Sequence, residues 1–166
     1  GMLPDEVHEY VSRIKKDVAG IDVGFHGHNN LMLAMANSLA AVAAGAAFID
    51  ATLQGIGRSV GNTQLEVLVL LLNKLGYSTG VDTTKLMDAG DTIVRPRMPI
   101  ATGIDSLSAT LGDVQFHSSF LPIVQRVAKE QGVDIRKLVI EISKVNRITV
   151  TEDLANKTAS RLKEQK

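Results

Sequence analysis

Helical and strand-like segments alternate through the first half of the chain, and this order constrains the fold more than any other feature. Apolar residues recur at helical spacing over 4–18, 31–44 and 63–75, while short apolar runs at 21–25 and 47–53 predict strands. Strands that alternate with helices pair in parallel, because each helix carries the chain back across the sheet. The pattern therefore predicts an α/β fold with a parallel sheet.

This alternation supplies few strands. A third strand could begin at Val81, but its signal is weak. A two-stranded parallel sheet is not a stable unit by itself, and an open sheet leaves its edges and the apolar faces of its helices uncovered. We therefore expect the chain to form a homo-oligomer, to pair with a missing N-terminal half, or to be a fragment of a longer protein.

The second half of the chain is mostly helical in its pattern. The segment 95–102 contains two prolines and is typical of a connector. The change of pattern near residues 77–82 predicts two domains, an α/β domain of residues 1–80 and a helical domain of residues 81–166. The helices expected in the second half cover residues 84–94, 106–111, 118–131, 135–144 and 152–163.

Composition excludes several classes of protein. Lysine and arginine total 18, as do aspartate and glutamate, which argues against a nucleic-acid or membrane-surface partner. The apolar residues are dispersed among charges, so we expect no membrane span. Cysteine is absent, which rules out a thiolate metal site. Because the N-terminus lacks a signal-peptide pattern, we expect a soluble cytoplasmic protein.

Two histidines one residue apart follow the first expected strand, in Gly24-Phe25-His26-Gly27-His28-Asn29-Asn30. Residues i and i+2 of a strand point to the same face, so both imidazoles can converge on one cation. Two imidazoles and a carboxylate would leave coordination positions open for a chelating substrate. The alternative is that both histidines cap the next helix or bond backbone carbonyls.

Four further polar residues are candidates for a site, and each has a structural alternative. Asn62 ends a glycine-rich loop and could contact a ligand or cap the following helix. Asp50 ends the second expected strand and could face a site or bond the local backbone. Arg58 could bind a substrate carboxylate or lie in solvent. His117 is unremarkable when judged from the residues alone.

Two segments of the first half carry a family resemblance. Phe25-His26-Gly27-His28-Asn29-Asn30-Leu31 resembles the metal-binding strand of the metal-dependent pyruvate aldolases and Claisen-type synthases. This superfamily includes hydroxymethylglutaryl-CoA lyase and isopropylmalate synthase. Gly61-Asn62-Thr63-Gln64-Leu65-Glu66 resembles its Gly-Asn loop. The resemblance implies a TIM (β/α)8 barrel, which needs eight strands over about 250 residues. We therefore expect this chain to hold the C-terminal part of a barrel.

The second half resembles the helical communication domain of the 4-hydroxy-2-oxovalerate aldolase family, in the segment 85–96 and in Ser118-Ser119-Phe120-Leu121. That resemblance implies cleavage of a 4-hydroxy-2-oxo acid to pyruvate and an aldehyde, and an acylating aldehyde dehydrogenase as partner. Gly55-Ile56-Gly57-Arg58 is also similar to the isopropylmalate synthase loop. An acyl-CoA condensing enzyme and a truncated, non-catalytic interaction module therefore remain alternatives.

The resemblance also assigns roles to residues. His26 and His28 match the histidine ligands of a divalent metal, Mn²⁺ or Mg²⁺, which acts as a Lewis acid on the keto acid, and Asn62 matches an asparagine near that metal. The resemblance implies that the family's third metal ligand, an aspartate, lies on the first barrel strand and that its catalytic arginine and histidine belong to the same early region. We expect this chain to contain none of them. His117 stands where the family has a tyrosine that helps to place the substrate, so we expect a different substrate or stereochemical preference.

Overall fold

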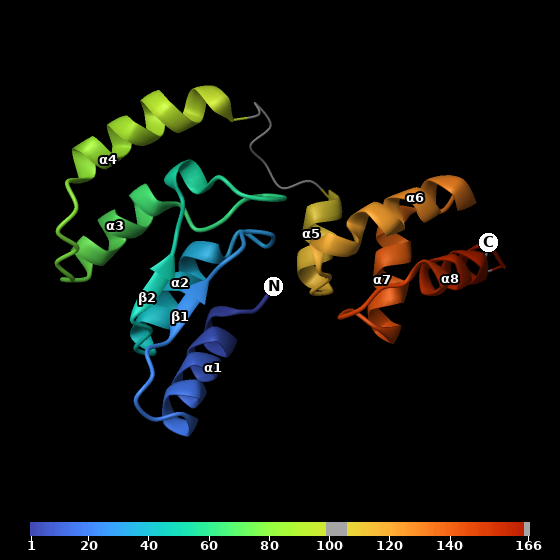
Figure 1. Ribbon diagram of the computed structural model, residues 1–166, viewed down its shortest axis with the longest axis horizontal. Coiled ribbons are helices and arrows are strands. Elements are labelled where there is room, and N and C mark those ends of the chain that lie inside the picture. The colour runs from blue at the N-terminus through green and yellow to red at the C-terminus, as the bar shows by residue number, and fades with distance from the viewer. Residues whose placement is uncertain (99–105, 165–166) are drawn as a thin grey trace. The chain divides into compact units, whose positions relative to one another are not determined.

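The chain forms two compact units in a computed structural model that describes residues 1–98 and 106–164. The N-terminal unit comprises Met2–Gly103, and the C-terminal unit comprises Ile104–Lys166 together with Gly1. Both strands belong to the N-terminal unit, and the elements described in the C-terminal unit are helices joined by short loops (Figure 1). The protein is therefore an α/β protein rich in helices.

The N-terminal unit alternates helices and strands in the expected order. Its elements, including the 3₁₀ helices η1 and η3 and the π-helical turn η2, are α1 (Pro4–Asp17), β1 (Gly24–His26), α2 (Ala34–Ala43), β2 (Phe48–Asp50), η1 (Leu53–Gly55), α3 (Leu65–Lys74), α4 (Thr83–Ala89), η2 (Gly90–Val94) and η3 (Arg95–Arg97). Val7 and Val11 of α1 form a buried core with Val23 and Ala41, and partly buried apolar residues of both strands pack against it.

The two strands pair in parallel, as the alternation predicts. Gly24 lies opposite Phe48, and His26 lies opposite Asp50. The predicted boundaries of the first strand, 21–25, were wrong, because the strand begins at Gly24 and includes His26. The expectation of a buried strand was also wrong, since Gly24 and His26 are exposed. Each strand has a single hydrogen-bonded neighbour among the described residues, and this leaves much of its surface uncovered.

The segment after α3 differs from the prediction in two respects. Val81 does not begin a strand but precedes α4. The helix predicted for 84–94 does not stop before Pro96, because it continues through η2 into η3, which contains that proline. Proline fits the first turn of a helix, where its missing N–H is not needed. Residues 99–102 of the predicted connector lie outside the described residues.

Helix α4 packs against α3, and η2 contacts η1, so residues 83–94 belong to the N-terminal unit. The compact units thus divide the chain later than the pattern change near residue 80. The two divisions rest on different criteria, and the assignment of residues 81–166 to a communication-type domain stays a prediction.

The C-terminal unit closes a core of its own. Val124 and Val127 of α6, Leu138 of α7 and Ala155 of α8 are completely buried. The N-cap of α7 is Asp134, whose side chain accepts the backbone N–H groups of the first turn. The elements of this unit are α5 (Ser106–Asp113), the 3₁₀ helix η4 (Ser118–Phe120), α6 (Leu121–Gln131), α7 (Ile135–Val145) and α8 (Glu152–Glu164).

Among residues 1–98 and 106–164, no helix combines the length and the apolar character that crossing a bilayer requires.

Candidate metal site

Strand pairing brings His26 next to a carboxylate. His26 is the last residue of β1 and lies opposite Asp50, the last residue of β2. Nδ1 of His26 is 3.3 Å from Oδ2 of Asp50. Both side chains are accessible, with exposed fractions of 48% and 73%. Of the two alternatives for Asp50, the structure therefore favours the one in which it faces the candidate site.

His28 lies beyond the strand, where the chain pairs with the loop that ends at Asn62. The two residues form an isolated antiparallel bridge, and Thr63 N donates to Gly27 O at 3.2 Å. Gly27 suits this position, because a Cβ there would lie 2.9 Å from Cε1 of Phe25 and 3.2 Å from Oγ1 of Thr63. The close packing between the two histidines thus requires a residue without a side chain.

Asn62 contacts the second imidazole directly. Its Oδ1 is 2.9 Å from Nδ1 of His28, and its Nδ2 donates to the carbonyl of Ile56 at 3.2 Å. Because an amide oxygen can only accept, this contact makes Nδ1 of His28 the donor. The alternative that Asn62 caps the next helix was wrong, since α3 begins at Leu65 and its N-cap residue is Gln64.

The two imidazoles lie side by side, with ring centroids 4.8 Å apart and ring planes at 89°. Each ring has its Nδ1 beside an oxygen, of Asp50 for His26 and of Asn62 for His28. A proton on Nδ1 places the lone pair of a neutral imidazole on Nε2. Metal-binding histidines usually have this arrangement, in which one nitrogen donates to an oxygen and the other holds the metal.

The donor set fits part of a divalent-metal site. Two imidazoles suit Mn²⁺ and other first-row metals, and an oxygen lies beside Nδ1 of each ring. No cluster of three or more histidine, aspartate or glutamate side chains suited to hold a metal is found among residues 1–98 and 106–164. The residues present therefore fit part of such a site, through the nitrogen donors of two imidazoles.

The other two candidate residues are Arg58 and His117. Arg58 is exposed in the loop after η1. His117 belongs to the C-terminal unit, where its Nδ1 accepts the N–H of Ser119 at 3.3 Å and its ring lies 6.0 Å from that of Phe120. His117 is thus the N-cap of η4.

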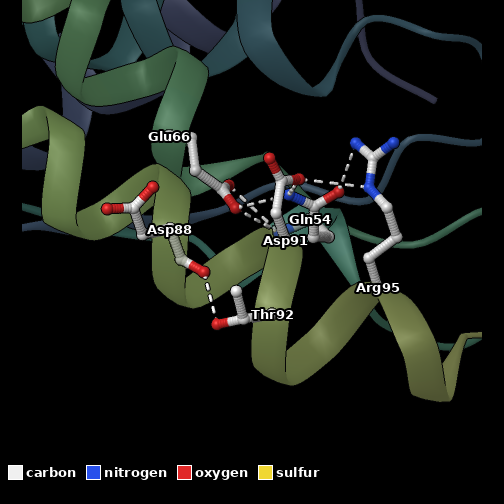
Figure 2. A network of polar contacts seen from close by, with 6 residues as sticks. All are labelled: Gln54, Glu66, Asp88, Asp91, Thr92 and Arg95. Atoms are coloured by element: carbon white, nitrogen blue, oxygen red, sulfur yellow. Dashed lines mark hydrogen bonds and ion pairs between the residues drawn. The ribbon is translucent and has the colours of Figure 1, made fainter.

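A buried carboxylate near the site has no assigned role in the sequence analysis. Glu66, in the first turn of α3, is only 3% exposed and accepts hydrogen bonds from Gln54 (Figure 2). In the sequence it is a glutamate at the start of an otherwise apolar helix. That position is consistent with an ordinary exposed first turn, so only its packing reveals it.

With this geometry in view, comparison with known proteins identifies the family. The sequence pattern of the HMGL-like family, a TIM-barrel superfamily, matches residues 1–93. These residues include both histidines and Asn62. This chain belongs to the HMGL-like family. The family relationship that the two segments predicted is therefore confirmed.

Curated relatives of this HMGL-like chain are named 4-hydroxy-2-oxovalerate aldolase. The Geobacillus stearothermophilus protein is 43% identical over 153 residues, which are 92% of this chain and 44% of the relative. The Geobacillus thermodenitrificans protein is 42% identical over 165 residues, or 99% of this chain and 48% of the relative. The chain thus spans about half the length of the curated relatives it matches.

A solved structure shows a similar fold at low sequence identity. The carboxyl transferase domain of Rhizobium etli pyruvate carboxylase, solved with 3-hydroxypyruvate, has a TM-score of 0.73 and 15% identity. The match covers 98% of the HMGL-like chain and 30% of the other chain. At this identity the likeness concerns the fold alone.

Proposed function

We propose that this chain is the C-terminal part of a metal-dependent aldolase that cleaves a 4-hydroxy-2-oxo acid, such as 4-hydroxy-2-oxovalerate, to pyruvate and an aldehyde. The observation that carries the proposal is the pair of imidazoles at the end of β1, each with Nδ1 beside an oxygen. The aldolase relatives add support, because their alignments cover 92% and 99% of the chain and so extend beyond residues 1–93.

In this proposal His26 and His28 hold a divalent metal, Mn²⁺ or Mg²⁺, through their Nε2 atoms. Such a metal supplies a Lewis acid that polarises the oxygens of a bound 2-oxo acid. Asp50 and Asn62 orient the two rings and keep the proton on Nδ1. The position near the metal that the resemblance implies for Asn62 stays a prediction.

The remaining ligands and the catalytic base come from outside this chain. The two histidines provide two nitrogen donors, and the described residues offer no cluster of three acidic or histidine side chains that could hold a metal. We therefore propose that further strands complete the barrel and bring in a carboxylate ligand and the groups that take the 4-hydroxyl proton. The homo-oligomer, the aldehyde dehydrogenase partner and the cytoplasmic location stay predictions.

His117 is proposed to contribute to substrate placement. Its imidazole is exposed, and its Nδ1 accepts the N–H of Ser119, so the proton of the neutral ring is on Nε2. This N–H could donate to a substrate oxygen, as a tyrosine hydroxyl could. A histidine side chain is shorter than a tyrosine side chain and directs its donor differently. This difference supports the expectation of a changed substrate preference.

Complementation tests the proposed function. The 166-residue chain alone should release little pyruvate from 4-hydroxy-2-oxovalerate in the presence of Mn²⁺. Co-expression with the part of the Geobacillus stearothermophilus relative that this chain does not match should restore pyruvate release, and His28→Ala should abolish it. Strong pyruvate release from the chain alone would refute the need for outside ligands. Restored activity that persists in His28→Ala would refute the metal site.

A further inference from the structure

Glu66 is a buried carboxylate that the proposed chemistry does not use. Its oxygens accept the backbone N–H of Gln54 at 2.9 and 3.0 Å, and Oε1 also accepts Nε2 of Gln54 at 3.0 Å. Figure 2 shows the carboxylate pointing from α3 toward Gln54. A buried charge costs free energy unless hydrogen bonds compensate it. The hydrogen bonds recorded for the Glu66 carboxylate all come from Gln54.

Gln54 has a backbone conformation that glutamine rarely adopts. Its φ and ψ angles are 56° and 13°, in the left-handed region, within η1. Residues other than glycine, asparagine and aspartate are disfavoured there, because their Cβ atoms approach the backbone too closely. Such strain persists where surrounding contacts hold it. The bonds from Glu66 are contacts of this kind, since they fix the Gln54 N–H itself.

The backbone directly after Gln54 holds Asn62. Asn62 N donates to the carbonyl of Gly55 at 2.9 Å, and Asn62 Nδ2 donates to the carbonyl of Ile56 at 3.2 Å. The same asparagine accepts Nδ1 of His28 at 2.9 Å. A continuous series of contacts therefore runs from the carboxylate of Glu66 through Gln54 and Asn62 to the second imidazole.

The segment after α4 covers the other side of this arrangement. A Cβ at Gly90 would overlap Oε1 of Glu66, so the backbone at the start of η2 packs directly on the carboxylate. Arg95 donates to Oε1 of Gln54 at 2.9 Å, and its Nε lies 3.2 Å from Oδ1 of Asp91 (Figure 2). Both Asp91 and Arg95 are exposed, so solvent weakens their contribution relative to that of Glu66.

We propose that Glu66 is a positioning residue for the metal site, because it holds Gln54 in the left-handed conformation and so presents Asn62 to His28. The inference rests on the proposed metal-binding role of His28 only for its consequence on affinity. Its structural part concerns the metal-free chain: loss of the carboxylate releases η1, Asn62 moves, and the proton of His28 is no longer held on Nδ1.

Glu66→Gln tests this in the full chain, because it keeps the size of the side chain and turns one acceptor into a donor. In proton–nitrogen correlation NMR of the metal-free protein, the wild type should show His28 with its proton on Nδ1. The variant should lose this preference and bind Mn²⁺ about tenfold more weakly. The matched control is Glu6→Gln, which removes a carboxylate that accepts Leu3 N at 2.6 Å in the first turn of α1.

A rescue variant separates positioning from a general loss of stability. Glycine adopts the left-handed region readily, so Gln54→Gly should make the η1 conformation independent of Glu66. In the double variant Glu66→Gln/Gln54→Gly, the Nδ1 proton of His28 and most of the Mn²⁺ affinity should return. If Glu66 merely stabilised α3, Gln54→Gly would restore neither the Nδ1 proton of His28 nor the Mn²⁺ affinity.

Two results would overturn the inference: an unchanged His28 signal in Glu66→Gln, or a loss that Gln54→Gly does not restore. An equal loss in Glu6→Gln would overturn it as well. Failure of the proposed function is distinct. If the wild-type chain bound no Mn²⁺ while the His28 signal still followed Glu66, the positioning role would stand and the metal-binding role would fall.

Discussion

The two compact units differ in how completely they bury their apolar residues. In the C-terminal unit, α6, α7 and α8 pack around side chains with no exposure at all, among them Val127, Leu138 and Ile142. In the N-terminal unit, Phe48 of β2 is 61% exposed and Leu70 of α3 is 39% exposed. The helical C-terminal unit thus has the more completely buried core, although it contains neither of the paired histidines.

The physical reason lies in how each element satisfies its backbone. A helix bonds its own N–H and C=O groups, so a few helices can close a core once their apolar faces meet. A strand needs neighbours on both edges, and β1 and β2 have only each other within the described residues. The candidate metal site lies in the unit that lacks such neighbours, which is consistent with its incomplete donor set.

The largest expected effect tests the closed core. Ile142→Ala removes a completely buried side chain from α7 and should lower the free energy of unfolding of the C-terminal unit by about 3 kcal/mol. Thermal denaturation followed by circular dichroism measures it. Val67→Ala, at an exposed position of α3, is the control and should change the same transition little. Equal losses in the two variants would remove the contrast between the units.

The second prediction concerns the candidate metal site in the open unit. His28→Ala should weaken Mn²⁺ binding by about tenfold or more, because it removes one of two nitrogen donors. Electron paramagnetic resonance of free Mn²⁺ measures the affinity. His8→Ala, on α1, is the matched control and should leave it unchanged. Indistinguishable affinities in His28→Ala and the wild type would contradict the site.

A pH-dependent contribution to stability is expected from the carboxyl group of Asp134 in the C-terminal unit. The side chain of Arg136 and its backbone N–H hold the pKa of the Asp134 carboxyl well below its usual range. A carboxyl group whose pKa is lower in the folded state stabilises the fold at pH values above its unfolded pKa of about 3.9. This stabilisation is lost as the pH falls toward the folded pKa. Asp134→Asn should therefore lower the melting temperature at neutral pH, and its difference from the wild type should shrink in acid. A difference that grows on acidification would contradict this.

The smallest expected effect on stability concerns an exposed apolar side chain of the N-terminal unit. It tests the same difference in burial between the two units. Phe48→Ser should change the free energy of unfolding by no more than about 0.5 kcal/mol, since Phe48 is largely exposed. The same substitution should reduce self-association, because exposed apolar surface on a strand favours contacts with other chains. Sedimentation velocity measures the association. A large loss of stability with unchanged association would indicate that Phe48 is part of a closed core.

Helices were predicted more accurately than strands, and the reason is local. The apolar spacing at 135–144 and 152–163 matches α7 (Ile135–Val145) and α8 (Glu152–Glu164) almost residue for residue. The boundaries of β1 depend on its pairing with β2, and pairing with a distant segment leaves no mark in the spacing of apolar residues. The prediction therefore began the strand three residues too early and ended it one residue too early.

The candidate site shows the same limit. The spacing of two suffices to expect His26 and His28 near one another, because side-chain direction in extended backbone is a local property. The contacts of Asn62 with His28 and of Glu66 with Gln54 join residues 34 and 12 positions apart. Such contacts follow from the folded loop, so the residues alone left Asn62 with two alternatives, a ligand contact or a helix cap, and gave Glu66 no role.

The central claim is that His26 and His28 offer their Nε2 atoms to one divalent cation. Proton–nitrogen correlation NMR during a Zn²⁺ titration tests it most directly, with Zn²⁺ as a diamagnetic probe and the other two of the four histidines, His8 and His117, as internal references. We expect the Nε2 signals of His26 and His28 to shift together while both references stay in place. Shifts at Nδ1, or a response from only one of the pair, would contradict the claim.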